Sequence, residues 1–169
     1  MEKSVHAQVK MTAAAKITRI IFDILFIIGI AFAISLPFIL PIVYKTGLNL
    51  YMPPLFDFGL TLKEDYGILM AFMYVVDIFF LVMVWDAGRI YRRLEKGLTF
   101  DRRNVNALRR IALFSLIEGF LFFGKTFYYG SYWTLFIAFV CFMIGLFSKV
   151  LQDVFRRAAE TKEENDLTI

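Results

Sequence analysis

The sequence has very few of the residues from which most active sites and metal sites are built. Its 169 residues include one cysteine, Cys141, and one histidine, His6. A single cysteine excludes an intramolecular disulfide, and these counts also exclude a Cys/His metal cluster. The chain has no recognisable Ser/His/Asp set and no glycine-rich phosphate loop. We therefore expect a protein that is not an enzyme and that carries no metal or cofactor.

Apolar and aromatic residues are present in excess. Hydrophobic residues make up 59% of the chain and aromatic residues 18%, and the mean hydropathy is +0.64, whereas soluble domains are about 45–50% apolar. Apolar runs at about 17–44, 67–88, 109–128 and 133–153 could each cross a hydrocarbon core of about 30 Å as a helix. The sequence predicts an all-α integral membrane four-helix bundle, a single domain over residues 1–169.

The distribution of basic residues predicts how this bundle sits in the membrane. Lysines and arginines are concentrated in the connection between the second and third spans, with others near the two termini. The connections on the opposite side contain Lys45 and Lys63, with Lys125 at the margin. Because cytoplasmic loops are rich in Lys and Arg, we expect an N-in/C-in, multi-pass protein of the plasma membrane. Its basic helical loop and its tail at 156–169 would be cytoplasmic.

Two acidic residues lie near the middle of predicted spans, Asp77 in the second and Glu118 in the third. Lys125 lies seven residues after Glu118, on the same helix face but nearer the outer surface. Two carboxylates at similar depth cannot both be ionised cheaply without a cation. One interpretation is a proton-carrying or ligand-sensing site. The other is that protonated acids form hydrogen bonds between helices.

A shallower set of charges lies within a turn or two of the predicted cytoplasmic surface. Its members are Asp23, Asp86, Lys149 and Asp153. Lys149 could form an ion pair with Asp23 or Asp86 across the bundle, or extend its side chain to the headgroups. Either arrangement predicts a structural role for this layer.

Two cytoplasmic segments could bind something outside the protein. The candidate residues are Arg92, Arg93, Arg102, Arg103, Arg109 and Arg110 in the basic loop, and Glu163, Glu164 and Asp166 in the tail. The arginines could attract anionic lipid headgroups or an acidic partner, or could serve orientation alone. Direct nucleic-acid binding is not expected, because no recognisable module is present.

The second half of the chain carries several short motifs in a fixed order. They are Gly97-Leu98-Thr99-Phe100, Asn104-Val105, Leu108-Arg109-Arg110-Ile111, Val154-Phe155-Arg156-Arg157 and Glu163-Glu164-Asn165-Asp166-Leu167-Thr168-Ile169. In these motifs the chain resembles the DUF2975 family of small bacterial four-span membrane proteins. The family often has proline where this chain has Thr99. The first 88 residues resemble it only in the arrangement of spans.

The resemblance implies a regulatory role rather than a known chemistry. The family has no established activity, and its members look like companions of small helix-turn-helix DNA-binding regulators. It therefore implies a regulatory or sensor protein of the membrane that engages a cytosolic transcription regulator. The alternatives are a small proton-coupled transporter, for which a homo-oligomer could supply a pathway, and an immunity-type membrane protein. Both would use the buried acids Asp77 and Glu118.

Overall fold

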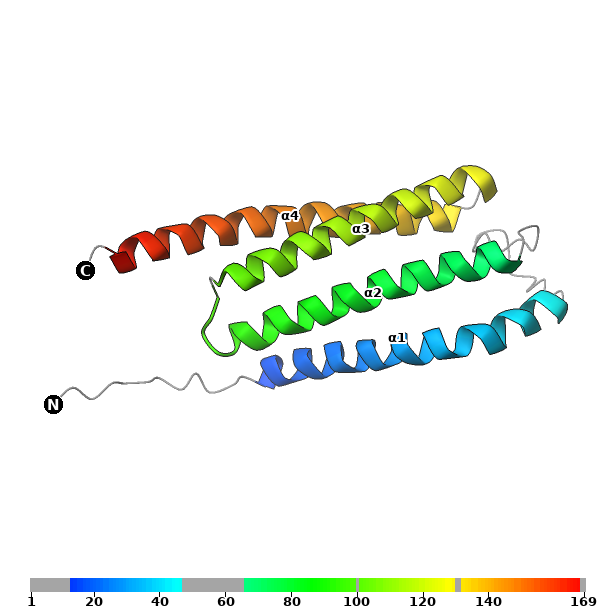
Figure 1. The fold of residues 1–169 in the computed structure, drawn as a ribbon, viewed down its shortest axis with the longest axis horizontal. Coiled ribbons are helices and arrows are strands. Elements are labelled where there is room, and N and C mark those ends of the chain that lie inside the picture. The colour runs from blue at the N-terminus through cyan, green and yellow to red at the C-terminus, as the bar shows by residue number, and fades with distance from the viewer. Residues whose placement is uncertain (1–12, 47–65, 100, 130–131, 168–169) are drawn as a thin grey trace.

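The computed structural model describes residues 13–46, 66–99, 101–129 and 132–167. They form four helices, α1 (Ala13–Thr46), α2 (Tyr66–Leu94), α3 (Arg102–Tyr129) and α4 (Tyr132–Leu167). Successive helices run in opposite directions, so the start of α1, the α2–α3 turn and the end of α4 lie together (Figure 1). We call this the turn end. The all-α class predicted from the apolar runs is confirmed.

Three helices are long and apolar enough to cross a membrane, over Ile17–Ile42, Tyr66–Leu94 and Tyr132–Thr161. Helix α3 is not among them in the described part of the chain, and its six charged residues lower its mean hydropathy, namely Arg102, Arg103, Arg109, Arg110, Glu118 and Lys125. Large apolar side chains are exposed along α1 and α4, among them Ile27, Phe38, Phe139 and Phe147. A monomer in water rarely exposes so much contiguous apolar surface. These features indicate a membrane protein.

The helices continue beyond the apolar runs at the turn end. Helix α2 continues to Leu94, with Arg92 and Arg93 in its last turn. The first part of the expected basic loop is therefore helical. Helix α4 continues to Leu167, so most of the segment at 156–169 is helical rather than a loose tail. Its alanines, arginines, lysine and glutamates are strong helix formers. The change from apolar to charged composition marks a change of surroundings along one helix.

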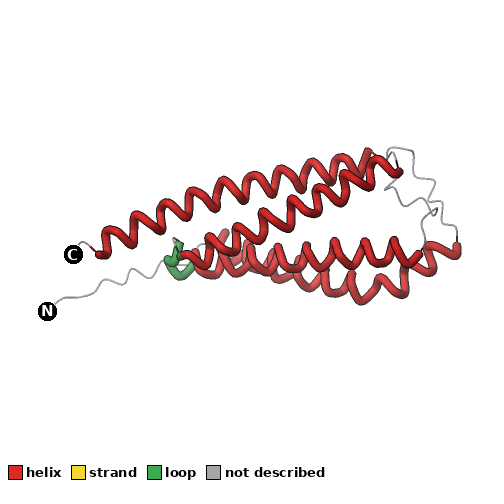
Figure 2. The backbone as a smooth tube through the Cα atoms, turned by 45° about the horizontal axis from the view of Figure 1, so that its top comes forward, coloured by secondary structure: helices red, strands yellow, loops and turns green. Residues whose placement is uncertain are grey.

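The four helices pack in sequence order rather than around a common axis. Helices α3 and α4 pack along most of their length, α2 packs on α3, and α1 packs on α2. Within the described helices, α1 approaches only α2 and α4 approaches only α3 at 8 Å between Cα atoms. The bundle is therefore open. Its two pairs lie closest at the turn end and diverge toward the other end (Figures 1 and 2).

Small residues allow α3 and α4 to pack closely. On α4 the buried residues recur every three or four positions from Thr134 to Gln152, with Ala159 two turns further on, namely Thr134, Ala138, Cys141, Gly145, Ser148, Gln152 and Ala159. A Cβ atom on Gly145 would lie only 2.8 Å from Cγ of Leu116 on α3. Between α2 and α3 larger side chains meet, in aromatic pairs such as Phe72–Phe122 with ring centroids 5.5 Å apart and, nearer the turn end, in an aliphatic cluster that includes Ile90 and Leu108. Small side chains favour close helix packing in lipid, as between α3 and α4. Between α2 and α3 larger side chains fill the space instead.

Candidate functional site

The α2–α3 turn begins with a glycine that ends α2. Gly97 has a φ of 73°, the left-handed conformation that only glycine adopts at little cost. The amide of Leu98 donates to the carbonyl of Arg93 at 3.0 Å, and the amide of Gly97 to that of Leu94 at 3.0 Å. This pair of bonds is a Schellman motif, which satisfies carbonyl groups left over at a helix end. The Gly97-Leu98 motif therefore has a structural role.

Asn104 holds the turn together from inside. Its side chain is fully buried, and its amide nitrogen donates to the carbonyls of Leu98 at 2.9 Å and Thr99 at 3.0 Å. Its side-chain oxygen accepts a hydrogen bond from Nη1 of Arg93 at 3.1 Å. Asp101 completes the turn, because its Oδ1 accepts the amide of Arg103 at 2.7 Å and so caps α3. The sequence assigned Asn104 no role, and its place in a family motif was the only signal.

A charged pair joins α2 to α3 near this turn. Arg110 Nε lies 2.7 Å from Asp86 Oδ2, and Nη2 lies 2.6 Å from Oδ1. Asp86 is only 2% exposed, whereas the Arg110 side chain is about half exposed (49%). Two parallel bonds of this kind are strong and directional. Arg110 was expected to contact a partner or lipid, but its guanidinium group is bound within the protein.

The expected ion pair between Lys149 and Asp23 or Asp86 is wrong. Lys149 Nζ instead lies 3.7 Å from Asp153 Oδ1 and donates to Gln152 at 3.0 Å, both on its own helix. Asp23 lies 3.9 Å from Arg19, also within one helix. The reason is the open packing order, since α4 packs on α3 and does not approach α1 or α2.

The deep polar residues do not assemble into one site. Asp77 is 5% exposed, and its Oδ2 has no hydrogen-bond partner. Glu118 is equally buried, with Oε2 lying 3.9 Å from the Cys141 thiol of α4 and Oε1 unpartnered. The Lys125 ammonium lies 4.0 Å above the ring of Phe72 on α2. Glu118 and Lys125 thus contact different neighbouring helices.

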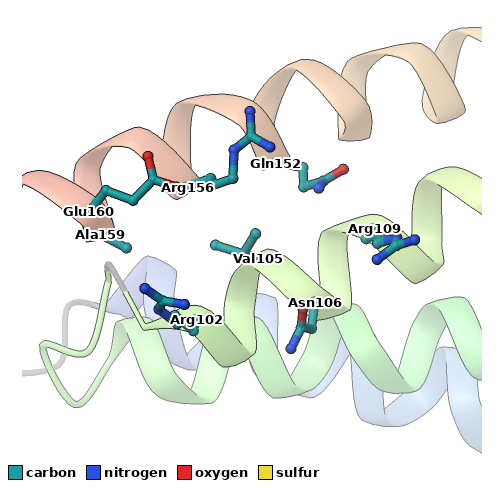
Figure 3. Close-up of a pocket in the computed structure, with 8 residues that line it drawn as sticks. All are labelled: Arg102, Val105, Asn106, Arg109, Gln152, Arg156, Ala159 and Glu160. Carbon is teal, nitrogen blue, oxygen red and sulfur yellow. The ribbon is translucent and has the colours of Figure 1, made fainter.

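A groove between α3 and α4 at the turn end brings exposed charges together. It encloses about 300 Å³ and is lined by Arg102, Val105, Asn106, Arg109, Gln152, Arg156, Ala159 and Glu160 (Figure 3). We call it the α3–α4 groove. Arg102 and Arg109 come from α3, and Arg156 and Glu160 come from α4, with the Arg156 side chain running along α4. Arg156 also lies 3.6 Å from Asp153.

The candidate binding residues therefore divide by their surroundings. Arg93 and Arg110 hold the protein together, and Arg92 donates to the carbonyl of Gly88 at 3.2 Å. Arg102, Arg103 and Arg109 are exposed. In the tail Glu164 is exposed on α4, whereas the side chains of Glu163 and Asp166 lie outside the described residues. Among the described residues, no group of three His, Cys, Asp or Glu side chains could hold a metal ion.

Comparison with known proteins finds one family. The model of a family described as "Protein of unknown function (DUF2975)" matches residues 44–169. The match contains α2, α3 and α4 with both of their connections, and it leaves out nearly all of α1. No curated protein and no solved structure matches the chain.

Proposed function

The chain belongs to the DUF2975 family, whose function is unknown, and we propose that it is a membrane-embedded regulatory protein that binds a cytosolic partner at its turn end. We propose four spans, α3 included, in the plasma membrane of a bacterium, with both termini inside. The antiparallel order of the helices supports this orientation, because it gathers the basic turn, the start of α1 and the end of α4 on one side. Basic segments beside spans favour the cytoplasmic side.

The observation that carries the proposal is the α3–α4 groove. Three arginines line it, Arg102, Arg109 and Arg156, together with one carboxylate residue, Glu160. Guanidinium groups bind carboxylates through paired hydrogen bonds, which makes an acidic segment of a protein a suitable occupant. Beyond the groove α4 continues to Leu167 with Glu164 exposed, which adds a second surface of opposite charge.

The family resemblance suggests the kind of partner, a small helix-turn-helix DNA-binding regulator. Such a protein would be held at the membrane by the groove and by the end of α4. Holding a transcription regulator away from DNA is a simple way in which a membrane protein without catalytic residues can act. Nucleic acid would then be bound by the partner and not by this chain.

Co-expression with a helix-turn-helix regulator encoded beside it tests the proposal. We expect the regulator to co-purify with the wild type in mild detergent. It should be lost when Arg102→Gln and Arg109→Gln are combined, or when residues 160–169 are deleted. The combination of Arg89→Gln and Lys96→Gln removes the same charge at the same end but outside the groove, and should retain the regulator. Retention by the groove variant would refute the groove as the contact.

A transporter or an immunity-type protein is the second candidate, because Asp77 and Glu118 each bury a carboxylate oxygen without a partner. Buried acids within spans often mark proton or ligand pathways. Proton flux into liposomes that contain the purified protein would support this candidate, provided that Asp77→Asn and Glu118→Gln abolish it. Asp153→Asn, which alters a half-exposed acid near the surface, is the control.

A further inference from the structure

A second cavity lies on the other side of the turn, outside the α3–α4 groove. It encloses about 530 Å³ and is lined by Trp85, Arg89, Arg92, Arg93, Lys96, Leu98, Asp101 and Arg103. We call it the α2 cavity. Ligand sites commonly have volumes of about 300–1,000 Å³. Its lining carries a single carboxylate, Asp101, among several cations, so its chemistry favours an anion.

The α2 residues of this cavity form a ladder along one helix face. Trp85, Arg89 and Arg92 are separated by four and three positions, which places them above one another, and Lys96 follows in the turn after α2 ends at Leu94. At 1.5 Å per residue Arg89 and Arg92 lie about 6 and 10.5 Å beyond Trp85 along the axis. Trp85 is the member nearest the apolar part of α2. The ladder thus changes from aromatic to cationic in the direction that leads out of a membrane.

Not all of these cations are available to a ligand. Arg93 is bound to Asn104, and Arg92 donates to Gly88 and lies 5.5 Å above the Trp85 ring. Three further lining side chains, Arg89, Lys96 and Arg103, are exposed and have no ion pair in the described part of the chain.

The charge of the α2 cavity is not balanced within the protein. The Oδ1 of Asp101 is already used to cap α3, and like charges around one cavity repel unless an anion lies among them. Orientation in the membrane requires basic residues near a span, but it does not require cations from two helices around one cavity.

We propose that the α2 cavity binds the phosphate of an anionic phospholipid headgroup, with the lipid's glycerol and first acyl carbons against Trp85. Basic pockets at the cytoplasmic ends of spans bind such headgroups, and tryptophan prefers the same depth. Trp85 is 46% exposed and its ring centroid lies 5.4 Å from that of Phe26 on α1, so an apolar wall continues below the cations. A soluble anion has no apolar part that could pack against Trp85. The proposal does not depend on the regulatory function.

Lipid binding by the purified full-length protein tests this assignment. Native mass spectrometry in mild detergent would give apparent dissociation constants for phosphatidylglycerol and phosphatidylcholine. We expect wild-type protein to prefer phosphatidylglycerol. Each removed cation should weaken that binding about fivefold, since a basic residue near an anionic surface contributes about 1 kcal/mol. Arg89→Gln should therefore show about a fivefold loss, and Arg89→Gln with Lys96→Gln about a 25-fold loss.

Two controls make the result decisive. Arg157→Gln removes an exposed cation of α4 outside the cavity and should change binding less than twofold, within the scatter expected for a distant charge. Inorganic phosphate should not compete with phosphatidylglycerol at equal concentration. The proposal is overturned if phosphatidylcholine binds as tightly as phosphatidylglycerol, if Arg157→Gln matches Arg89→Gln, or if inorganic phosphate competes while Trp85→Ala has no effect. Because Arg89 is exposed, its single variant carries the test even if the double variant unfolds.

Discussion

Arg109 and Arg110 are neighbours in the sequence, and their guanidinium groups have different surroundings. Arg110 binds Asp86 of α2 through two hydrogen bonds, whereas Arg109 lines the α3–α4 groove. Successive helix residues point about 100° apart, so one faces the neighbouring helix and the other faces the groove. At the scale of the residue, the role of each charge depends on what lies beside it and not on its type.

The Asp86–Arg110 pair leads to a prediction about stability. Asp86→Asn removes the charge and one acceptor from a buried position, and we expect the free energy of unfolding to fall by about 2 kcal/mol. The loss should be no larger, because half-exposed Arg110 can turn to water. Asp153→Asn affects an exposed pair and should cost less than about 0.5 kcal/mol. Thermal unfolding in detergent would compare them, and equal losses would contradict the role given to Asp86.

Asn104 gives a second prediction at this scale. Asn104→Ala removes three hydrogen bonds from the interior of the turn, at about 1 kcal/mol each, so we expect a loss of about 3 kcal/mol. Limited trypsin digestion should also cleave faster after Lys96, because the turn would open. Asn106→Ala, an exposed neighbour on α3, is the control. Unchanged cleavage in Asn104→Ala would show that the turn does not depend on this side chain.

At the scale of the element, helix existence was predictable and helix ends were not. The apolar runs predicted all four helices, because backbone groups in lipid must be satisfied within the segment. The span predicted at 133–153 did not say where α4 would end. Charged residues after Asp153 indicated a departure from the membrane, but α4 continues to Leu167. The composition of a segment indicates whether lipid or water surrounds it. Whether the segment is helical depends also on helix propensity and packing.

The close packing of α3 on α4 leads to an element-scale prediction. Gly145→Ala would place a Cβ atom 2.8 Å from Cγ of Leu116 and 3.3 Å from the carbonyl oxygen of Ala112. The backbone oxygen cannot move away, so we expect a loss of about 1–3 kcal/mol from overpacking. Gly124→Ala, on α3, has nothing within 4 Å of its new Cβ and should be neutral or slightly stabilising. Equal unfolding midpoints for the two variants would argue against the α3–α4 packing described.

At the scale of the whole molecule, the helices form an open series with one charged end. The turn, the start of α1 and the end of α4 lie together there, and both charged cavities open near it. The open order also explains why Lys149 has no partner on α1 or α2. Asp77 and Glu118 could be proposed as a site because they lie at similar depth along their helices. Depth does not determine how each helix is rotated about its axis, and so which neighbour each side chain faces. Glu118 contacts α4, and Oδ2 of Asp77 has no hydrogen-bond partner.

Orientation is the prediction that belongs to this scale. A reporter fused after residue 55 should lie outside the cytoplasm, and a reporter fused after residue 169 should lie inside it. The reason is that the basic residues favour a cytoplasmic position for the turn end. Replacing Arg89, Lys96, Arg103 and Arg109 with glutamine should weaken this preference. A cytoplasmic reporter at residue 55 would reverse the assignment of sides.

The sequence by itself determined the class of this protein and its division into helices, because apolar length and helix formation are local properties that lipid enforces on each segment. It also contained the turn, since Gly97, Asp101 and Asn104 act within a few residues of one another. Only the tertiary structure decided which partner each charge takes. Arg110 binds Asp86, Arg93 binds Asn104, and Lys149 binds within α4. The physical reason is that ion pairs require contact between particular helix faces, and the packing order of helices sets those contacts.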